Sequence, residues 1–142
     1  MSRRKKLLSI LAVVLLLLGD YLYWTFPMSL DRCLPKAVYG STNADLIGYD
    51  SFFTPRNVEL ETDWVKGILD AVKQTEVTRR PKFGTMSEPF FYLYLYYPDG
   101  YTRMTVVANG NISVDPDYRS DRRLYFDGGE ELYRVLQQFA EE

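Results

Sequence analysis

The stretch "FYLYLYYPDGYTRMTVVANG", Phe91 to Gly110, decides the fold of this 142-residue chain. Its two halves are rich in alternating aromatic and aliphatic residues, and a Pro-Asp-Gly sequence joins them. An Asp-Gly pair between two such runs is typical of a two-residue β-hairpin turn. With Asp99-Gly100 as the turn, Leu95 is expected opposite Met104. One face of the hairpin then carries the aliphatic side chains Leu93, Leu95, Met104 and Val106.

The opposite face of the hairpin is rich in tyrosine. Arg103 is expected opposite Tyr96, where its guanidinium group would add a cation–π contact. An exposed row of tyrosines is typical of protein interfaces, and aromatic rows also stack on sugars. The alternative is that the N-terminal strands or the linker cover this face, or that the tyrosines only strengthen cross-strand pairing. The candidate binding residues are Tyr92, Tyr94, Tyr96 and Arg103.

Further strands flank this hairpin. A three-residue loop ending at Asn111 places Ile112 and Val114 on the aliphatic face, and burial favours it over a two-residue loop. A short last strand is expected over 124–126. Two weaker strand patterns, 45–53 and 57–60, precede the hairpin.

Two amphipathic helices complete the expected domain. One begins at Thr62, and the other follows an Asp127-x-x-Glu130 sequence that resembles a capping box. Their apolar residues follow the i, i+3, i+4, i+7 spacing: Val65, Ile68, Leu69 and Val72 in the first, and Leu132, Val135, Leu136 and Phe139 in the second. Each helix has a single apolar stripe, so both are expected on the aliphatic face. The fold class is therefore α+β, an antiparallel sheet with a central tyrosine-rich hairpin and two helices on one face.

Basic residues follow the first of these helices at Arg79, Arg80 and Lys82. Such residues commonly complement the negative end of a helix dipole, and we favour that interpretation. Contact with anionic lipid or a wall polymer is the alternative.

The N-terminus has the pattern of a membrane signal. Four basic residues precede a run over 7–18 that is apolar except for Ser9, and aromatic residues typical of the bilayer interface follow it. No cleavage site with small residues is evident, so we expect an uncleaved signal anchor that contacts the bilayer through residues 7–26, with a cleaved signal peptide as the alternative. The positive-inside rule then predicts a single-pass protein with a cytoplasmic N-terminus and an extracellular C-terminal domain. The expected divisions are an anchor over 1–29, a linker over 30–36 and a domain over 37–142.

Composition argues against several function classes. From Leu30 onward there are 13 Lys and Arg residues against 18 Asp and Glu, a net charge of −5, which argues against a nucleic-acid partner. The chain has no histidine and one cysteine, Cys33, so a histidine base, an internal disulfide and a cysteine zinc site are excluded. Oxygen-bearing residues alternate from Asn109 to Asp117, but they do not follow the EF-hand pattern. We expect no cofactor and no bound metal.

Several segments together resemble small, functionally uncharacterised, membrane-anchored or lipoprotein-type domains of Gram-positive bacteria. They are the basic start before "LLSILAVVLLLLG", the helix "TDWVKGILDAVKQTEVTRR", the hairpin "FYLYLYYPDGYTRMTVV" and the closing "LYFDGGEELYRVLQQF". The resemblance implies an extracytoplasmic location and no known activity.

These observations predict a non-enzymatic, membrane-anchored extracytoplasmic module that binds an unidentified protein or envelope component through its sheet. One alternative is an accessory or structural subunit of a membrane complex that works through its anchor helix. The other is a cryptic envelope hydrolase with paired carboxylates, for which Asp115, Asp117, Glu130 and Glu131 are the candidates.

Overall fold

A computed structural model describes residues 2–50, 55–81, 88–116 and 123–141. Its α-helices are α1 (Arg3–Thr25), α2 (Thr62–Gln74) and α3 (Glu130–Glu141), and two short 3-10 helices are η1 (Leu30–Cys33) and η2 (Lys36–Gly40). Its strands are β1 (Met28–Ser29), β2 (Asn43–Tyr49), β3 (Pro55–Leu60), β4 (Glu76–Arg80), β5 (Phe90–Tyr97), β6 (Gly100–Val107), β7 (Ile112–Asp115) and β8 (Leu124–Asp127).

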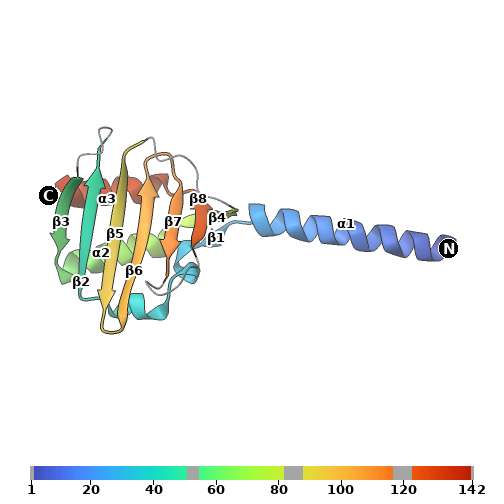
Figure 1. The fold of residues 1–142 in the computed structure, drawn as a ribbon, viewed down its shortest axis with the longest axis horizontal. Helices are drawn as coiled ribbons and strands as arrows, with labels where there is room; N and C mark the ends of the chain where they lie inside the picture. Colours follow the sequence, from blue (N-terminus) through green and yellow to red (C-terminus); the bar gives the residue numbers. More distant parts are fainter. Residues whose placement is uncertain (1, 51–54, 82–87, 117–122, 142) are drawn as a thin grey trace.

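All eight strands form one antiparallel sheet in the order β1-β4-β8-β7-β6-β5-β2-β3. Helices α2 and α3 both lie on the same side of it, and α1 extends away from the edge formed by β1 and β4 (Figure 1). The α+β class, the central tyrosine-rich hairpin and the placement of both helices on one face are therefore confirmed. The two weak strand patterns, 45–53 and 57–60, correspond to β2 and β3. Residues 51–54, at the expected end of the first, lie outside the described residues.

The register of the central hairpin differs from the expected one by two residues. Tyr97 pairs with Gly100, so the loop is Pro98-Asp99 rather than Asp99-Gly100. Proline presets the backbone dihedral φ needed at the second position of a turn, and Gly100 has a φ of 153°. Leu93 therefore pairs with Met104. Because side chains alternate with a period of two, a two-residue shift leaves every side chain on its predicted face.

The following turn shows the same kind of shift. Its three loop residues are Ala108 to Gly110 instead of the expected loop ending at Asn111, since the Val107 amide donates to the Asn111 carbonyl at 2.9 Å. Ile112 consequently pairs with Val106, and Val114 pairs with Met104. Both side chains are fully buried on the aliphatic face, as the burial argument predicted.

Helix α2 begins at Thr62 as expected, and its four predicted stripe residues are buried. Helix α3 differs at its start. Asp127 belongs to β8 and makes an ion pair with Arg80 at 3.5 Å, so the predicted capping box is wrong. The helix instead follows Gly128, whose φ of 106° favours glycine and turns the chain from the sheet into the helix. Leu132, Leu136 and Ala140 form its buried stripe.

Residues 76–80, which the sequence analysis did not identify as a strand, form β4. Val77 is its one buried hydrophobic residue, so the alternation that marks a half-buried strand is too short to detect. Arg79 and Arg80 therefore do not lie at the end of α2, and that interpretation of the basic residues is wrong. Arg79 instead donates from Nη1 to the Tyr23 carbonyl in the last turn of α1, at 3.3 Å. Lys82 lies outside the described residues.

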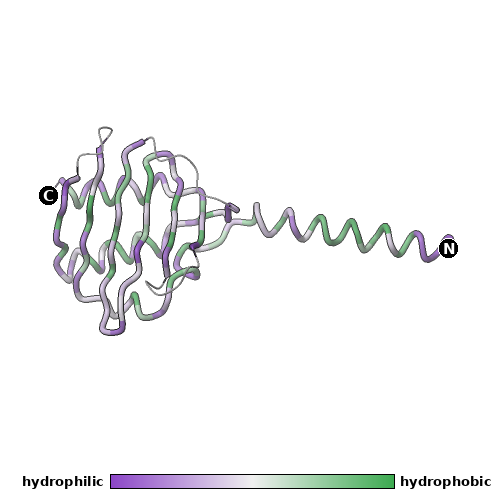
Figure 2. Tube along the Cα trace, viewed as in Figure 1, coloured by the Kyte–Doolittle hydropathy of each residue, from purple (hydrophilic) through white to green (hydrophobic). Residues whose placement is uncertain are grey.

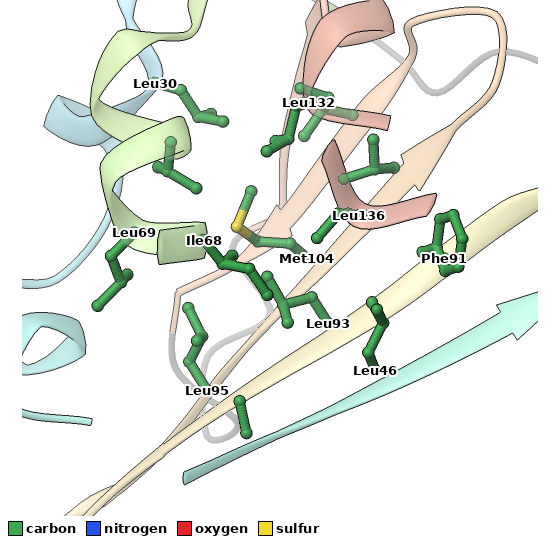
Figure 3. Close-up of a cluster of buried hydrophobic side chains, with 14 of the residues drawn as sticks. Leu30, Leu46, Ile68, Leu69, Phe91, Leu93, Leu95, Met104, Leu132 and Leu136 are labelled. Carbon is green, nitrogen blue, oxygen red and sulfur yellow. The ribbon is translucent and has the colours of Figure 1, made fainter. Parts of the chain in front are cut away.

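The core fills the space between the sheet and the two helices (Figure 3). Ile68 and Leu136 meet the sheet residues Leu93 and Met104 there, and all four are fully buried. Residues 30–36, expected as a linker, supply two members of this core, Leu30 and Leu34. Strand β1 also pairs with β4, so the chain joins the domain within a few residues of the end of α1.

Helix α1 is long and apolar enough to cross a membrane. Its middle is strongly hydrophobic and its N-terminal end is hydrophilic (Figure 2). Every residue of α1 is exposed except Trp24, which is half-buried near the domain. The helix ends before Pro27, because the residue that precedes a proline is driven to extended backbone, and Phe26 has a ψ of 124°. The apolar surface of α1 therefore has no partner among the residues that the structure describes.

The hairpin core gives a direct prediction. We expect Leu93→Ala to lower the free energy of unfolding by about 2–5 kcal/mol. Leu93 is fully buried in the core between the sheet and both helices, so its truncation leaves a cavity. Urea denaturation followed by circular dichroism measures the loss. Leu124→Ala is the control, since Leu124 is 39% exposed. Equal effects of the two substitutions would show that the aliphatic face is not the core.

Candidate functional site

The sheet surface opposite α2 and α3 carries a continuous group of aromatic rings. We call it the aromatic face, and it consists of Tyr49, Phe90, Tyr92, Tyr94, Tyr96 and Tyr101. Alternation along β5 places Tyr92, Tyr94 and Tyr96 there while Leu93 and Leu95 enter the core. Phe90 is buried, and the five tyrosines are half-buried. The predicted row of three tyrosines is thus one part of a larger surface.

The rings of the aromatic face support one another. Tyr94 and Tyr96 stack with an interplanar angle of 11° and a centroid distance of 6.3 Å. Tyr101, from β6, contacts both rings at 5.8 and 6.0 Å. At the other end, Tyr49 stacks on Phe90 at 4.8 Å. Such packing restricts the rings to few orientations, so these side chains would lose little further conformational entropy on contact with a ligand.

Arg103 lies beside the tyrosine row, but not where the sequence placed it. It pairs across the strands with Tyr94, and its guanidinium lies 5.4 Å from the ring centroid of Tyr92, so the expected contact with Tyr96 is wrong. The two-residue shift of the hairpin register places Arg103 opposite Tyr94 instead of Tyr96. Its guanidinium then lies diagonally over the next ring along β5, that of Tyr92.

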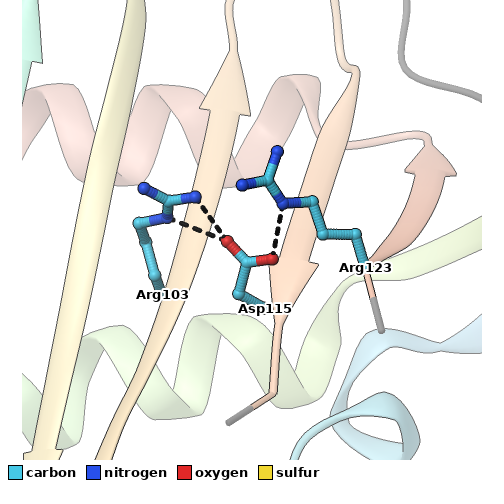
Figure 4. Close-up of polar contacts among 3 residues, drawn as sticks. All are labelled: Arg103, Asp115 and Arg123. Carbon is cyan, nitrogen blue, oxygen red and sulfur yellow. Dashed lines mark hydrogen bonds and ion pairs between the residues drawn. The ribbon is translucent and has the colours of Figure 1, made fainter. Parts of the chain in front are cut away.

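The orientation of Arg103 is set by Asp115. Nε and Nη2 of Arg103 both donate to Oδ2 of Asp115, at 2.9 and 2.6 Å (Figure 4). Arg123 donates to the other carboxylate oxygen at 2.9 Å. The Asp115 side chain is only 14% exposed, so these charge-assisted hydrogen bonds are partly shielded from water. They hold the guanidinium of Arg103 against the tyrosine row.

Tyr96 is tied to the neighbouring strand. Its hydroxyl donates to Oδ2 of Asp45 at 2.8 Å, across the β2–β5 pairing. Burial and the hydrogen bond to this carboxylate raise the pKa of Tyr96 to about 12. The hydroxyl is therefore neutral at physiological pH, and it donates a hydrogen bond to Asp45.

The oxygen-bearing residues considered for calcium are engaged in other contacts. Asn109 accepts a hydrogen bond from the backbone of Asn111, and the Asn111 side chain accepts one from Arg80. Asp115 is held by two arginines. Within the described residues, no three Cys, Asp or Glu side chains are grouped as metal ligands. Asp117 lies outside those residues.

The carboxylates considered for hydrolysis differ in their surroundings. Asp115 accepts hydrogen bonds from both Arg103 and Arg123. Glu131 is exposed and pairs with Arg134 at 3.1 Å, and Glu130 lies against Gly110 at the start of α3. The most ordered group of side chains on the described sheet surface is the aromatic face with Arg103 oriented beside it.

Three members of the aromatic face, Tyr49, Phe90 and Tyr101, and the neighbouring Asp45 were not identified as site residues from the sequence. Tyr49 and Asp45 belong to β2, which pairs with β5 although β3, α2 and β4 separate them along the chain. Phe90 directly precedes the quoted hairpin stretch and faces Tyr49. Alternation of Asp45, Ile47 and Tyr49 was the available signal, but it shows only that the three share a face. It does not show which strand lies next to them.

Comparison of the chain with protein-family models, curated proteins and solved structures finds no match. The resemblance to membrane-anchored domains of Gram-positive bacteria therefore stays a prediction.

The Tyr96–Asp45 pair predicts a pH dependence. The raised pKa means that folding favours neutral Tyr96, so its contribution to stability is complete below about pH 10 and disappears as the pH rises through about 12. The difference in phenolate absorbance between the wild-type protein and Tyr96→Phe isolates this ionisation. We expect it near pH 12, and at a lower pH when both proteins carry Asp45→Asn. An unchanged midpoint after the Asp45 substitution would contradict the assigned role of the carboxylate.

Proposed function

We propose that this protein is a membrane-anchored module outside the cytoplasm that binds a protein or envelope component through its aromatic face and performs no catalysis. The observation that carries the proposal is the arrangement of that face. Both helices cover the opposite surface of the sheet, while five tyrosines on this side remain partly accessible. Tyrosine offers a large contact area with only two side-chain torsions to restrict, which suits a binding surface.

The charged residues beside the rings add direction to this surface. Arg103 is only 27% exposed and is oriented by Asp115, so it can present its remaining N–H groups to an acceptor without first losing side-chain freedom. Asp45 lies on the other side of the row and holds Tyr96. A partner that stacks on the rings would thus meet a positive group on one flank and a carboxylate on the other. Such flanking charges fix the orientation of a bound partner more than they add affinity.

The location follows from α1. Its length and apolar character support membrane insertion, and the cluster from Arg3 to Lys6 supports a cytoplasmic N-terminus. The domain begins directly after α1, because β1 pairs with β4 and Leu30 of η1 belongs to the hydrophobic core. The aromatic face, on β2, β5 and β6, lies toward the edge of the sheet that is remote from α1, so it would be presented to membrane proteins and envelope polymers outside the bilayer.

The topology is tested in cells. We expect protease added to intact spheroplasts of a bacterial host to digest the domain, because the basic cluster retains the N-terminus in the cytoplasm. Immunoblotting with an antibody against the C-terminus follows the loss. A cytoplasmic protein serves as the integrity control. A domain that stays protected until the cells are lysed would exclude an extracellular location.

The binding surface is tested by removing its rings. We expect the triple variant Tyr92→Ala, Tyr94→Ala, Tyr96→Ala to lose at least about tenfold in partner crosslinking, since aromatic anchors commonly contribute 2 kcal/mol or more each to an interface. A photo-reactive residue at position 47, on the same face, reports the contact in cells. Cooperative unfolding should persist, because the aliphatic core is untouched.

Two controls accompany this experiment. The variant Lys66→Ala, Asp70→Ala, Gln138→Ala changes exposed positions of α2 and α3 and should crosslink as the wild-type protein does. Replacing α1 by an unrelated membrane helix should also preserve crosslinking. Loss of crosslinking after that replacement would instead favour an accessory subunit that works through its anchor. Loss of cooperative unfolding in the tyrosine triple variant would show that the rings are core residues.

A further inference from the structure

A second site lies where α1 meets the domain. A cleft of about 470 Å³ opens there, between the last turn of α1 and the edge of the sheet formed by β4 and β8. Four arginines line it, Arg32, Arg79, Arg80 and Arg123, together with four aromatic residues, Tyr23 and Trp24 of α1 and Tyr125 and Phe126 of β8. Among the residues that the structure describes, no carboxylate lines the cleft. This positive cavity belongs to a domain whose net charge is negative.

The four arginines differ in how their charge is balanced. Arg123 is paired with Asp115, and Arg80 is paired with Asp127 at 3.5 Å. Among the described residues Arg79 makes no ion pair; its Nη1 donates to the Tyr23 carbonyl and its guanidinium lies 4.4 Å from the Tyr23 ring centroid. Arg32 is exposed and likewise makes no ion pair there. Within the described part of the chain, two guanidinium charges therefore enter the cleft without a compensating carboxylate.

The position of the cleft indicates what could neutralise these charges. Tyr23 and Trp24 form part of its wall and follow the apolar run of α1. Tyrosine and tryptophan at the end of a membrane-spanning helix lie at the level of the lipid headgroups. If α1 spans the bilayer as proposed above, the cleft opens at the depth of the headgroup phosphates.

We propose that the cleft at the base of α1 binds a phosphate group, supplied by the headgroup of an anionic lipid in the outer surface of the bilayer. The fork of N–H groups on a guanidinium matches phosphate oxygens, and two such groups with no carboxylate partner provide the charge. A volume of about 470 Å³ is within the range of small-ligand pockets. The bound headgroup would fix the domain against the membrane and limit its rotation about the end of α1.

The Cys33 thiol also lines the cleft. Burial raises its pKa, and the charge of Arg79 acts in the opposite direction with a smaller effect. The thiol is therefore neutral at physiological pH, and it does not compete with a phosphate group for Arg79.

Trp24 provides a reporter inside the cleft. The chain has one other tryptophan, Trp64, which packs on Phe139 in the domain, so Trp64→Phe leaves Trp24 as the only tryptophan. The full chain with this substitution is placed in nanodiscs of neutral phosphatidylcholine that contain increasing fractions of phosphatidylglycerol. A parallel series adds inorganic phosphate to discs of phosphatidylcholine alone. We expect a saturable change in Trp24 emission with phosphatidylglycerol and none with inorganic phosphate.

Single substitutions assign the effect to the cleft. Arg32→Gln and Arg79→Gln should each raise the half-saturating fraction of phosphatidylglycerol about fivefold, the effect of one basic residue at an anionic surface. Lys36→Gln removes an exposed charge four residues from Arg32 that does not line the cleft, and it should change the fraction less than twofold. Because Arg32 is exposed, its substitution should leave folding intact even if that of Arg79 does not.

Each outcome has a distinct meaning. A saturable response to inorganic phosphate in neutral discs would retain the anion site but overturn its assignment to a lipid. A Trp24 signal that does not saturate, or an equal effect of Lys36→Gln, would overturn the site itself. Failure of the full chain to enter nanodiscs would instead contradict the membrane anchor on which the inference rests. That failure is recognised separately, because the protein then does not co-elute with lipid.

Discussion

Both helices need the same surface, the aliphatic side of the β5–β6 hairpin, and the rest of the structure depends on that burial. Leu93, Leu95, Met104 and Val106 are fully buried there. Each helix has one apolar stripe, so neither can cover the other side of the sheet. The burial of apolar area on one side stabilises the domain, and it also determines that the tyrosines of the hairpin occupy the side without helices.

The aromatic face is thus a consequence of how the core is built. A sheet with one open side requires residues that tolerate partial exposure, and tyrosine meets this requirement because its ring packs while its hydroxyl can reach water or a polar partner. In this sheet the tyrosines and the arginine beside them are held by specific contacts. Stacked rings lie along β5, Asp45 holds one hydroxyl, and Asp115 fixes the neighbouring Arg103. This order distinguishes a candidate binding surface from a merely solvated one.

At the junction between α1 and the domain, the fold brings together arginines that are far apart in the sequence. Arg32 follows α1 closely, whereas Arg79 and Arg123 are remote from it along the chain, yet all three line one cleft. The positive-inside rule counts only basic residues close to the membrane-spanning segment in the sequence. Arg79 and Arg123 lie far from α1 along the chain, so they do not count in the rule. They lie at the end of α1 because β4 and β8 pair beside it in the folded sheet. A positive site on the outer side is therefore compatible with the orientation proposed from the N-terminal cluster.

The sequence alone determined the fold class, the faces of the central hairpin, and the start and buried stripe of α2, because each depends on a local period of two or 3.6 residues; it also identified the long apolar segment that forms α1. It placed Tyr92, Tyr94, Tyr96 and Arg103 beside one another, although it assigned the wrong ring to Arg103. Tertiary structure decided what depends on distant pairing. Strand β4 joined the sheet because it pairs with β1 and β8, Tyr49 joined the aromatic face because β2 lies beside β5, and Arg79 reached the end of α1. Local periodicity specifies which side of a strand a residue faces, but the neighbour across the sheet is chosen by the packing of the whole domain.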